Sequence, residues 1–339
     1  MVLPDVANET LTRARPSASV IVPADGRGVD RAARLLAGGG IAALPTETVY
    51  GLAADATNGE AVARIFEAKR RPRFNPLICH VDGPAMARRF ARFGDLAERL
   101  ADRFWPGPLT LVVPLAEGAA IHPLVTAGLD TVAVRMPRGV ARDVIAALGS
   151  PVAAPSANRS GRISPTTARA VRDSLGDEAP LILDAGPARV GVESTIIDLS
   201  GDRPVCLRPG GIALADIEQV IDQPVTRADA DAAISAPGML RSHYAPGLPV
   251  RLNATDVRPG EALLAFGSGR IAGAGSAVAG VNLSPSGDLT EAAANLFAML
   301  DELDRSGAAA IAVMTIPADG LGEAINDRLA RAAAPRETP

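Results

Sequence analysis

The sequence predicts an α/β protein with two domains, a larger sheet covered by helices and a smaller α/β unit after it. Short apolar runs alternate with helical periodicity from residue 19 to residue 221, a pattern typical of a sheet packed against helices. The chain of 339 residues exceeds the size of one ordinary hydrophobic core. Near residue 226 small and acidic residues replace this alternation, which resumes at residue 262 and so indicates a second unit.

The expected elements of the first unit end at residues that stop regular structure. Pro45 and Pro137 close two apolar runs, because proline lacks the N–H that a further ladder bond needs. Two prolines around Gly107 predict a rigid turn, with Trp105 as a packing residue beside it. Strands are expected at 19–22, 41–44, 77–81, 111–114, 131–137, 152–154, 181–184, 194–199 and 205–207, and helices at 29–38, 60–68, 85–93, 96–104, 140–148 and 214–221. In the second unit, strands are expected at 262–266, 278–283 and 309–314, and helices at 289–306 and 321–333.

Composition narrows the class of protein. Hydrophobic residues make up 47% of the chain, which is enough to fold without metals or disulfides, and a formal net charge of -4 gives no overall basic field for nucleic acid. Cys79 and Cys206 lie far apart in apolar runs, which favours buried thiols in a reducing cytosol. No apolar run reaches the roughly 18 residues of a membrane span, and residues 1–15 do not resemble a signal peptide. We therefore expect a soluble, cytoplasmic protein with no membrane partner.

Lys69 is the only lysine among 34 basic residues. In a chain this rich in arginine, a remaining lysine indicates a position that needs a compact ammonium, and such lysines commonly contact phosphate. A solvated lysine at a helix end is the simpler interpretation. Pro72 and Pro76, however, hold the following segment off the helical path and leave Lys69, Arg71 and His80 around an extended loop. This arrangement favours a phosphate clamp.

Polar side chains also follow other expected strands, where α/β folds place their ligands. Thr46 begins a hydroxyl-rich turn, and Arg135 ends a strand, where it is expected to meet a carboxylate of the protein or of a substrate. The loop 155–167 carries six hydroxyl or amide side chains, of which helix caps explain only part, and Arg208 ends another strand. The sequence has no P-loop, zinc-protease or hydrolase-elbow motif. The lysine, arginine, hydroxyl and amide side chains at these strand ends suit the positioning of a nucleoside triphosphate and the neutralisation of its charge.

The segment 236–246 contains His243 and Tyr244, one of three histidines and one of two tyrosines. Passive linkers seldom carry such side chains, so the segment is expected to dock on another part of the protein. Either it is a tether with solvated side chains, or it closes over the nucleotide as a lid that excludes water. We favour the lid.

A series of motifs, in this order and spacing, resembles the YrdC family of L-threonylcarbamoyladenylate synthases. They are LPTETVYGL at 44–52, KRRP at 69–72, NPL at 75–77, WPGPLT at 105–110, VRMP at 134–137, APSANRSG at 154–161, EST at 193–195 and LRPG at 207–210. PGM at 237–239 and HYAP at 243–246, with the α/β unit that follows, resemble the longer two-domain type of that family.

The resemblance implies a YrdC-like twisted mixed sheet over 17–212, a linker and possible lid over 213–246, and a smaller Rossmann-like domain over 247–335. It implies that L-threonine, bicarbonate and ATP form threonylcarbamoyl-AMP and pyrophosphate, with Mg²⁺ as companion of the phosphates and no metal site built by the protein. The product would pass to the transferase machinery that modifies adenosine 37 of tRNA, with a weak RNA contact possible. By the same resemblance, the ATP-binding residues would be Lys69, Arg71, Asn75, Thr131, Ser156, Asn158, Thr166, Arg208 and Tyr244, with Lys69 and Arg71 as the catalytic pair, and the threonine-binding residues would be Thr46, His80, Arg135 and Ser194.

Two other interpretations remain open. An RNA-binding module of the same fold would need no chemistry, but the net charge and the two tyrosines disfavour it. A carbamoyl-transfer domain of the hydrogenase-maturation type would share the fold, but normally lies in a longer chain with acylphosphatase and zinc-finger segments.

Overall fold

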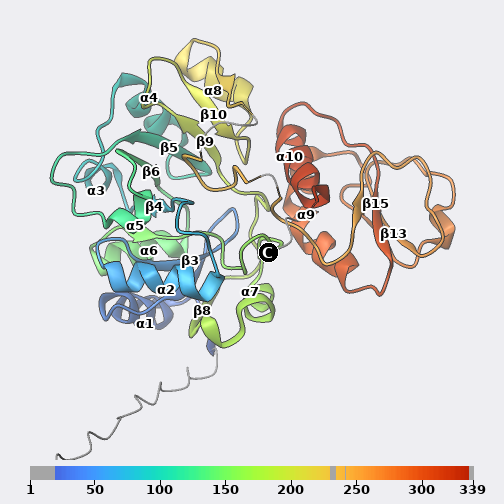
Figure 1. Cartoon of the computed structure of the whole chain (residues 1–339), viewed down its shortest axis with the longest axis horizontal. Helices are drawn as coiled ribbons and strands as arrows, with labels where there is room; N and C mark the ends of the chain where they lie inside the picture. The colour runs from blue at the N-terminus through green and yellow to red at the C-terminus, as the bar shows by residue number, and fades with distance from the viewer. Residues whose placement is uncertain (1–19, 230–233, 241, 336–339) are drawn as a thin grey trace, which may run out of the picture.

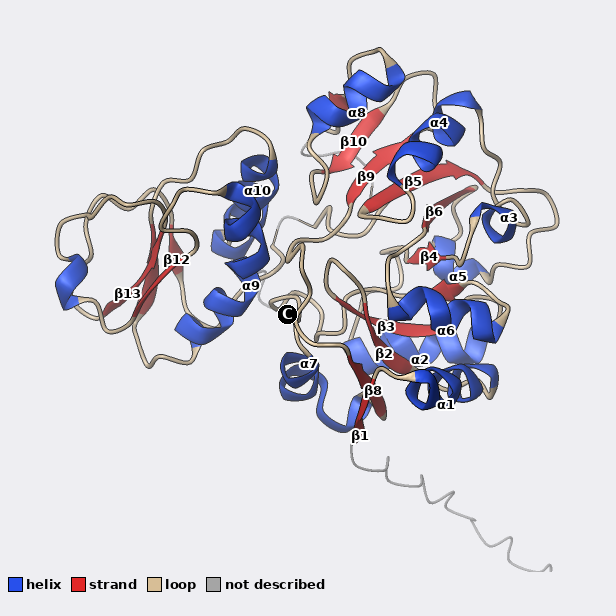
Figure 2. Ribbon diagram, turned by 180° about the vertical axis from the view of Figure 1, so that it is seen from behind, coloured by secondary structure: helices blue, strands red, loops and turns tan. Residues whose placement is uncertain are grey.

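The structure is a computed structural model that describes residues 20–229, 234–240 and 242–335. Two α/β domains lie side by side (Figure 1), as the sequence predicts. Helices α9 (Leu289–Asp304) and α10 (Leu321–Ala333) lie on the side of the smaller domain that faces the larger one (Figure 2). Within the described ranges, every helix is too short or too polar to cross a lipid bilayer.

The larger domain is built on one mixed sheet of eleven strands. In spatial order these are β1 (Val20–Pro23), β8 (Leu181–Asp184), β2 (Ala42–Pro45), β3 (Tyr50–Asp55), β7 (Val152–Ala153), β4 (Ile78–His80), β6 (Thr131–Arg135), β5 (Leu109–Pro114), β9 (Thr195–Asp198), β10 (Val205–Arg208) and β11 (Thr226–Arg227). β4 and β6 are parallel, whereas β5 and β6 are antiparallel, which confirms the predicted mixed sheet. The register of β4 and β6 pairs His80 with Arg135, so both strands end at the same point.

Helices pack against this sheet through apolar faces. They are α1 (Gly26–Ala37), α2 (Gly59–Lys69), α3 (Pro84–Ala87), α4 (Asp95–Phe104), α5 (Pro123–Thr126), α6 (Val140–Leu148), α7 (Ala168–Leu175) and α8 (Leu214–Ile221). α2 begins at Asn58, whose side chain accepts two backbone N–H groups, and ends at Arg70, where φ is 52°. Its last helical residue is Lys69, so the helix end fixes where the loop 70–77 starts.

Two local predictions for the first domain were wrong. The expected helix 85–93 ends at Ala87, because the residues after it exchange backbone hydrogen bonds with the end of β5: Arg92 N–H donates to Pro114, and Ala116 N–H donates to Phe90. No strand was expected between residues 45 and 60, but the chain returns after the turn as β3, antiparallel to β2. The polar turn 46–49 is therefore the tip of a hairpin, and its side chains project from the sheet.

The smaller domain has a parallel sheet of four strands, in the order β12 (Val250–Arg251), β15 (Ala310–Val313), β13 (Glu261–Ala265) and β14 (Gly280–Asn282). Asp288 caps α9 by accepting the N–H of Glu291 at 2.8 Å. α9 then buries an apolar stripe that includes Leu296, Phe297 and Leu300. The helical and strand periods expected from residue 262 onward are thus present, and β12 was missed because it has only two residues.

The two domains meet along α9 and α10. Two exposed ion pairs cross the boundary, Arg227 with Glu323 and Asp173 with Arg305. Gly191, with φ at +75°, lies so close to α9 that a Cβ there would overlap the backbone of residues 293 and 294. Helix α8, which falls in the expected linker range 213–246, packs into the core of the larger domain, and β11 extends its sheet.

Candidate active site

A pocket lies where the ends of β4, β6 and β10 meet the β2–β3 turn and the segment 236–244. Its wall includes most of the residues that the sequence singled out: Thr46, Arg71, His80, Arg135, Ser156, Ser194, Arg208 and Tyr244. The strand ends supply His80, Arg135 and Arg208, because β4, β6 and β10 run in the same direction and end at the same edge of the sheet.

Arg135 is held by three groups of the protein. Its Nε donates to the carbonyl oxygen of Gly107 at 3.2 Å, and its Nη1 donates to Thr48 Oγ1 at 2.9 Å. Its Nη2 lies 2.8 Å from Glu47 Oε1, an ion pair that lacks the alignment of a hydrogen bond. The carboxylate expected beside Arg135 is therefore one of the protein. Two of the five guanidinium N–H groups donate hydrogen bonds to these groups, and those that remain are candidates for a ligand carboxylate.

Thr46 and His80 complete this side of the pocket. The Thr46 hydroxyl donates to the carbonyl oxygen of Val49 at 2.6 Å and lies 2.8 Å from the Thr48 hydroxyl, so it also stabilises the turn. His80 Nδ1 lies 3.2 Å from the carbonyl oxygen of Ile78, which favours the tautomer with a proton on Nδ1 and a free Nε2 acceptor. Burial first, and the charge of Arg135 second, lower the pKa of His80 to about 3, so the imidazole is neutral at pH 7.

Lys69 is buried and does not line the pocket. Its ammonium donates to the carbonyl oxygen of Ser156 at 2.6 Å and also to that of Asn158. Burial first, and the neighbouring charge of Arg71 second, lower the pKa of Lys69 well below its ordinary value. Lys69 thus holds the loop that puts Ser156 on the pocket wall.

Arg71 and Asn75 come from the loop between α2 and β4. Arg71 donates through Nε to the carbonyl oxygen of Asn75 at 3.2 Å and through Nη2 to that of Pro76 at 2.8 Å. The Asn75 side chain is fully buried, yet neither its oxygen nor its nitrogen has a hydrogen-bond partner among the described residues. Buried amides are rarely left unpaired, so this one is a candidate ligand contact.

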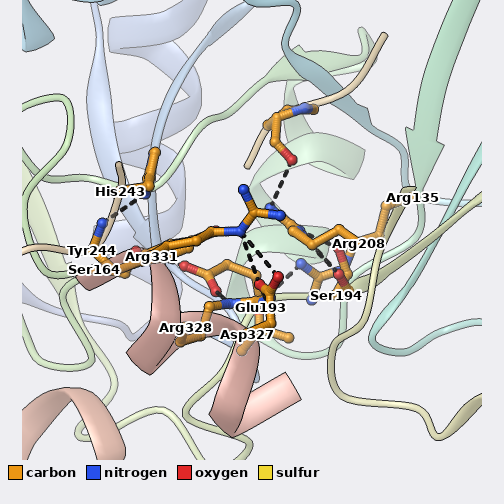
Figure 3. A network of polar contacts seen from close by, with 12 residues as sticks. Arg135, Ser164, Glu193, Ser194, Arg208, His243, Tyr244, Asp327, Arg328 and Arg331 are labelled. Carbon is orange, nitrogen blue, oxygen red and sulfur yellow. Dashed lines mark hydrogen bonds and ion pairs between the residues drawn. The ribbon is translucent and has the colours of Figure 1, made fainter. Parts of the chain in front are cut away.

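Ser194 and Arg208 lie beside one another at the pocket (Figure 3). The Ser194 hydroxyl lies 2.7 Å from the hydroxyl of Thr110, and Arg208 Nη2 donates to the Ser194 carbonyl oxygen at 2.9 Å. Before them in the chain, Glu193 accepts from Ser164 Oγ at 2.6 Å and from Arg328 Nε at 2.8 Å. Arg328 belongs to α10, so the smaller domain reaches the border of the pocket.

Residues on both sides of position 241 also line the pocket: Pro237, Gly238, His243 and Tyr244. His243 and Tyr244 are 6% and 1% exposed, so the solvated side chains expected of a tether are not present. The Tyr244 ring packs at a tilt against the His243 ring, with centroids 4.1 Å apart, and the φ of 61° at Tyr244 is unusual for a bulky residue. The cavity left inside is about 40 Å³, whereas ligand pockets usually hold roughly 300–1,000 Å³. With these residues in place, the cavity is too small for a nucleotide.

Three buried cations at the pocket lack an acidic partner. Lys69, Arg71 and Arg208 are at most 8% exposed, and within the described ranges none pairs with a carboxylate. The two nearby carboxylates are already paired, Glu47 with Arg135 and Glu193 with Arg328. Buried charges are costly without a counter-charge, so this excess favours a ligand that carries several negative charges.

Four further predicted residues lie away from the pocket wall. Asn75 is described above, and Asn158 donates to the carbonyl oxygens of Arg159 and Arg162 while its own Oδ1 has no partner in the described part of the chain. Thr166 lines a second cavity, between α7 and α9, of about 570 Å³. Thr131 is half-buried at the start of β6, at the other end of the strand from Arg135.

Sequence reasoning missed three charged residues at or beside the site: Glu47, Glu193 and Arg328. Glu47 and Glu193 lie inside quoted motifs, directly beside Thr46 and Ser194, and that position was their available signal. Arg328 lies on a helix with ordinary amphipathic spacing, so nothing in its neighbourhood distinguishes it. In the part of the chain that the structure describes, no three metal-ligating side chains gather.

Comparisons with known proteins agree across both domains. The family termed Sua5/YciO/YrdC, described as "Telomere recombination", matches residues 34–210, and the family described as "Threonylcarbamoyl-AMP synthase, C-terminal domain" matches residues 212–334. The threonylcarbamoyl-AMP synthase of Pyrococcus abyssi is 42% identical over 316 residues, which cover 89% of this chain and 92% of that protein. The one of Bacillus subtilis is 39% identical over 326 residues, 91% and 93% of the two chains. The crystal structure of P. abyssi Sua5 complexed with L-threonine has a TM-score of 0.85 and 38% identity, and covers 93% of this chain and 98% of that one.

Proposed function

This chain belongs to the Sua5/YciO/YrdC family in its two-domain, threonylcarbamoyl-AMP synthase form, and from that premise we propose how its pocket performs the reaction. The protein is an enzyme that forms threonylcarbamoyl-AMP, which serves the threonylcarbamoyladenosine modification of tRNA. The excess of buried positive charge from Lys69, Arg71 and Arg208 is the observation that carries the nucleotide half of the proposal.

The proposed substrates are L-threonine, bicarbonate and ATP. The deprotonated amine of threonine bonds to the carbon of bicarbonate, and water leaves, which gives a carbamate. A carbamate oxygen then attacks the α-phosphorus of ATP, the bond from that phosphorus to the bridging oxygen breaks, and pyrophosphate leaves. Both steps need the reactants aligned and the phosphate charge neutralised, and neither needs a nucleophile from the protein.

We assign threonine to the side of the pocket around Arg135. The guanidinium N–H groups of Arg135 that Thr48 and Gly107 leave free suit the threonine carboxylate. The hydroxyls of Thr46 and Ser194 and the neutral imidazole of His80 would surround the rest of the amino acid, and the unprotonated Nε2 of His80 can accept a hydrogen bond from its amine or hydroxyl.

We assign the phosphates of ATP to the side around Arg71 and Arg208. Both guanidinium groups line the pocket, and burial strengthens their interaction with an anion. Ser156 contributes a hydroxyl, and the unpaired side-chain amide of Asn75 and the unpaired Oδ1 of Asn158 are candidate contacts to ATP. Lys69 acts with Arg71 as the catalytic pair, because its ammonium orders the Ser156 loop and adds positive charge behind it. Thr131 and Thr166 remain outer candidates for ATP.

The segment 236–244 is proposed as the lid over ATP. Arg208 Nη1 donates to the carbonyl oxygen of Pro237 at 3.3 Å, so the closed lid uses a group that phosphate would take. Gly238, with φ at +89°, lets the lid backbone approach Arg208 and the Tyr244 hydroxyl where a Cβ would overlap both. The Tyr244 hydroxyl is buried and unpaired among the described residues, which suits a contact to the nucleotide.

The lid predicts a specific defect for Tyr244→Ala. ATP affinity should fall roughly tenfold, as for loss of a buried aromatic contact, and ATP consumed per threonylcarbamoyl-AMP recovered should rise because water reaches the acyl-adenylate. Both quantities come from parallel measurement of pyrophosphate and product. Tyr50→Phe, which alters the other tyrosine within the first core, is the matched control. An unchanged ratio with unchanged affinity would make the segment a tether.

Mg²⁺ is proposed as a companion of the triphosphate. The carboxylates at the pocket are both engaged by arginine, and in the described ranges no protein-built magnesium site is visible. Mg²⁺ usually keeps several waters and binds substrate phosphates, so this arrangement is compatible with it. The product is proposed to pass to the tRNA threonylcarbamoyl transferase machinery in the cytoplasm, with at most a weak RNA contact by this chain.

The decisive experiment incubates the full chain with ATP, radiolabelled bicarbonate and each amino acid in turn. Labelled acyl-adenylate and pyrophosphate should appear with threonine, and Arg208→Ala should abolish both, whereas Arg203→Ala, an exposed arginine earlier in the β9–β10 connection, should not. Pyrophosphate release that is independent of threonine would contradict the assignment. Salt-sensitive RNA binding without ATP turnover would favour the RNA-binding alternative instead.

A further inference from the structure

Arg328 is the most deeply buried charged side chain that the smaller domain directs towards the larger one. It is 0% exposed and lies on α10 (Figure 3). Its Nε donates to Glu193 Oε2 at 2.8 Å, its Nη1 donates to Asp327 Oδ2 at 2.7 Å, and its guanidinium carbon lies 5.1 Å from the centre of the Tyr244 ring. It does not line the pocket, but the two residues that it touches across the domain boundary, Glu193 and Tyr244, both do.

Glu193 would be a problem for nucleotide binding without this partner. It lies on the wall of a pocket whose phosphate side depends on Arg208, and it is fully buried. Burial alone would raise the pKa of Glu193, but the charges of Arg328 first and Arg208 second outweigh it and hold that pKa below its usual range. The carboxylate is therefore ionised, and Arg208 is the next cation that stabilises it after Arg328.

We propose that Arg328 is a positioning residue for nucleotide binding, which neutralises Glu193 and so keeps the guanidinium of Arg208 available to the phosphates. The proposal rests on the proposed function, because it takes the phosphate site to be at Arg208. Without Arg328, the buried carboxylate would have only Arg208 and the Ser164 hydroxyl to compensate it, and Arg208 would be drawn away from the nucleotide. The smaller domain thereby contributes to the charge balance of a pocket that it does not line.

The same helix holds the lid. Arg331 Nη1 donates to the carbonyl oxygen of Leu240 at 2.6 Å, and the N–H of His243 donates to the carbonyl oxygen of Arg331 at 3.3 Å. Tyr244 also packs against Phe297 of α9, with ring centroids 5.6 Å apart. The guanidinium of Arg328 thus contacts both Tyr244 of the proposed lid and Glu193 of the pocket wall.

The test compares ATP affinity, by calorimetry on the full chain, for Arg328→Met, Glu193→Gln and the double variant. Arg328→Met should weaken ATP binding about tenfold, in the range of ordinary coupling between sites. Glu193→Gln should not weaken it, and the double variant should return to within about twofold of the wild type, because no carboxylate is left to capture Arg208. Recovery by a second substitution is an outcome that a merely structural role of Arg328 does not produce.

The controls are the exposed ion pairs across the same boundary. Arg227→Gln and Arg305→Gln remove charge from the interface without touching the pocket, and they should leave ATP affinity unchanged. Wild-type affinity in Arg328→Met would overturn the proposal, and so would a double variant as weak as Arg328→Met. If Arg328→Met does not fold, the double variant decides alone: wild-type affinity supports the proposal and tenfold weaker binding overturns it.

Product formation is followed in parallel. A wild-type protein that binds ATP but makes no threonylcarbamoyl-AMP would overturn the proposed function, while the affinities of the variants would still decide the role of Arg328. A wild-type protein with no affinity for ATP would overturn both.

Discussion

The two domains treat their buried polar groups differently. In the smaller domain, Glu261 accepts two hydrogen bonds from Arg251, at 2.8 and 2.5 Å, and Ser284 donates to Glu291. In the larger domain the Asn75 amide and Asn158 Oδ1 have no hydrogen-bond partner among the described residues, and Lys69, Arg71 and Arg208 have no carboxylate partner there. In the described part of the smaller domain the one such buried atom is Arg328 Nη2, at the boundary with the larger domain. A folded domain normally satisfies its interior, so the unsatisfied interior marks where a ligand completes the structure.

Among the substitutions that test this difference between the domains, Lys69→Arg is expected to have the largest effect. The guanidinium is too large for a site where the ammonium meets the Ser156 and Asn158 carbonyl oxygens, so the loop with Ser156 must shift. We expect kcat/KM to fall roughly 100-fold, the typical cost of misplacing a site by about 1 Å. Arg73→Lys, an exposed change on the following loop, is the control and should be silent. Near-normal pyrophosphate release by Lys69→Arg would remove the case for this lysine.

Arg135→Ala separates the two halves of the pocket. Loss of charged hydrogen bonds to a carboxylate should raise the KM for threonine roughly 30-fold, with a much smaller change for ATP. Steady-state kinetics with each substrate varied in turn measures both. Arg138→Ala, an exposed arginine three residues further on, is the matched control. Equal changes in both KM values would contradict the assignment of threonine to Arg135.

His80 makes the larger domain sensitive to acid. Its pKa is about 3 in the folded state against 6.5 as the ordinary value, so below pH 6.5 the unfolded state binds a proton that the folded state does not. The free energy of unfolding should therefore fall as the pH drops, by about 2 kcal/mol between pH 6.5 and 5 from this group. Urea unfolding at pH 7, 6 and 5 should show a shallower pH dependence for His80→Asn. An identical slope in the variant would rule out this origin.

The smallest effect is expected in the smaller domain. Arg251→Gln removes the ion pair with Glu261, and a small loss of stability should follow, seen as a melting temperature lower by less than about 4 °C. KM values for ATP and threonine should not change, because both residues lie far from the pocket along β12 and β13. A changed KM would show that Arg251 and Glu261 of the smaller domain also affect substrate binding, which contradicts the difference drawn between the two domains.

The sequence predicted those parts that depend on local pattern. Arg135 and Arg208 were expected at strand ends and lie there, and the helices 140–148, 214–221 and 321–333 have the expected bounds. The fold class followed from the alternation of apolar runs, and the mixed sheet from the family resemblance.

What could not be predicted depends on contacts between distant parts of the chain. The sequence favoured an ammonium at Lys69 that faces a phosphate, whereas its position is set by carbonyl groups 87 and 89 residues further along. The pairing of Glu193 with Arg328 spans 135 residues. Thr131 and Arg135 share a strand, but only the register with β4 tells which end of that strand meets the pocket.

Gly191 is a position at which the spacing between the two domains can be changed in steps. Its backbone meets the backbone of α9 at a point where a single Cβ does not fit, and it touches neither the proposed threonine side nor the proposed phosphate side of the pocket. Larger side chains at this position would push α9 further from the larger domain. A series of such substitutions would vary the separation of the two domains in steps. The rate at which the proposed lid opens can then be compared with that separation, without altering any group proposed to contact a substrate.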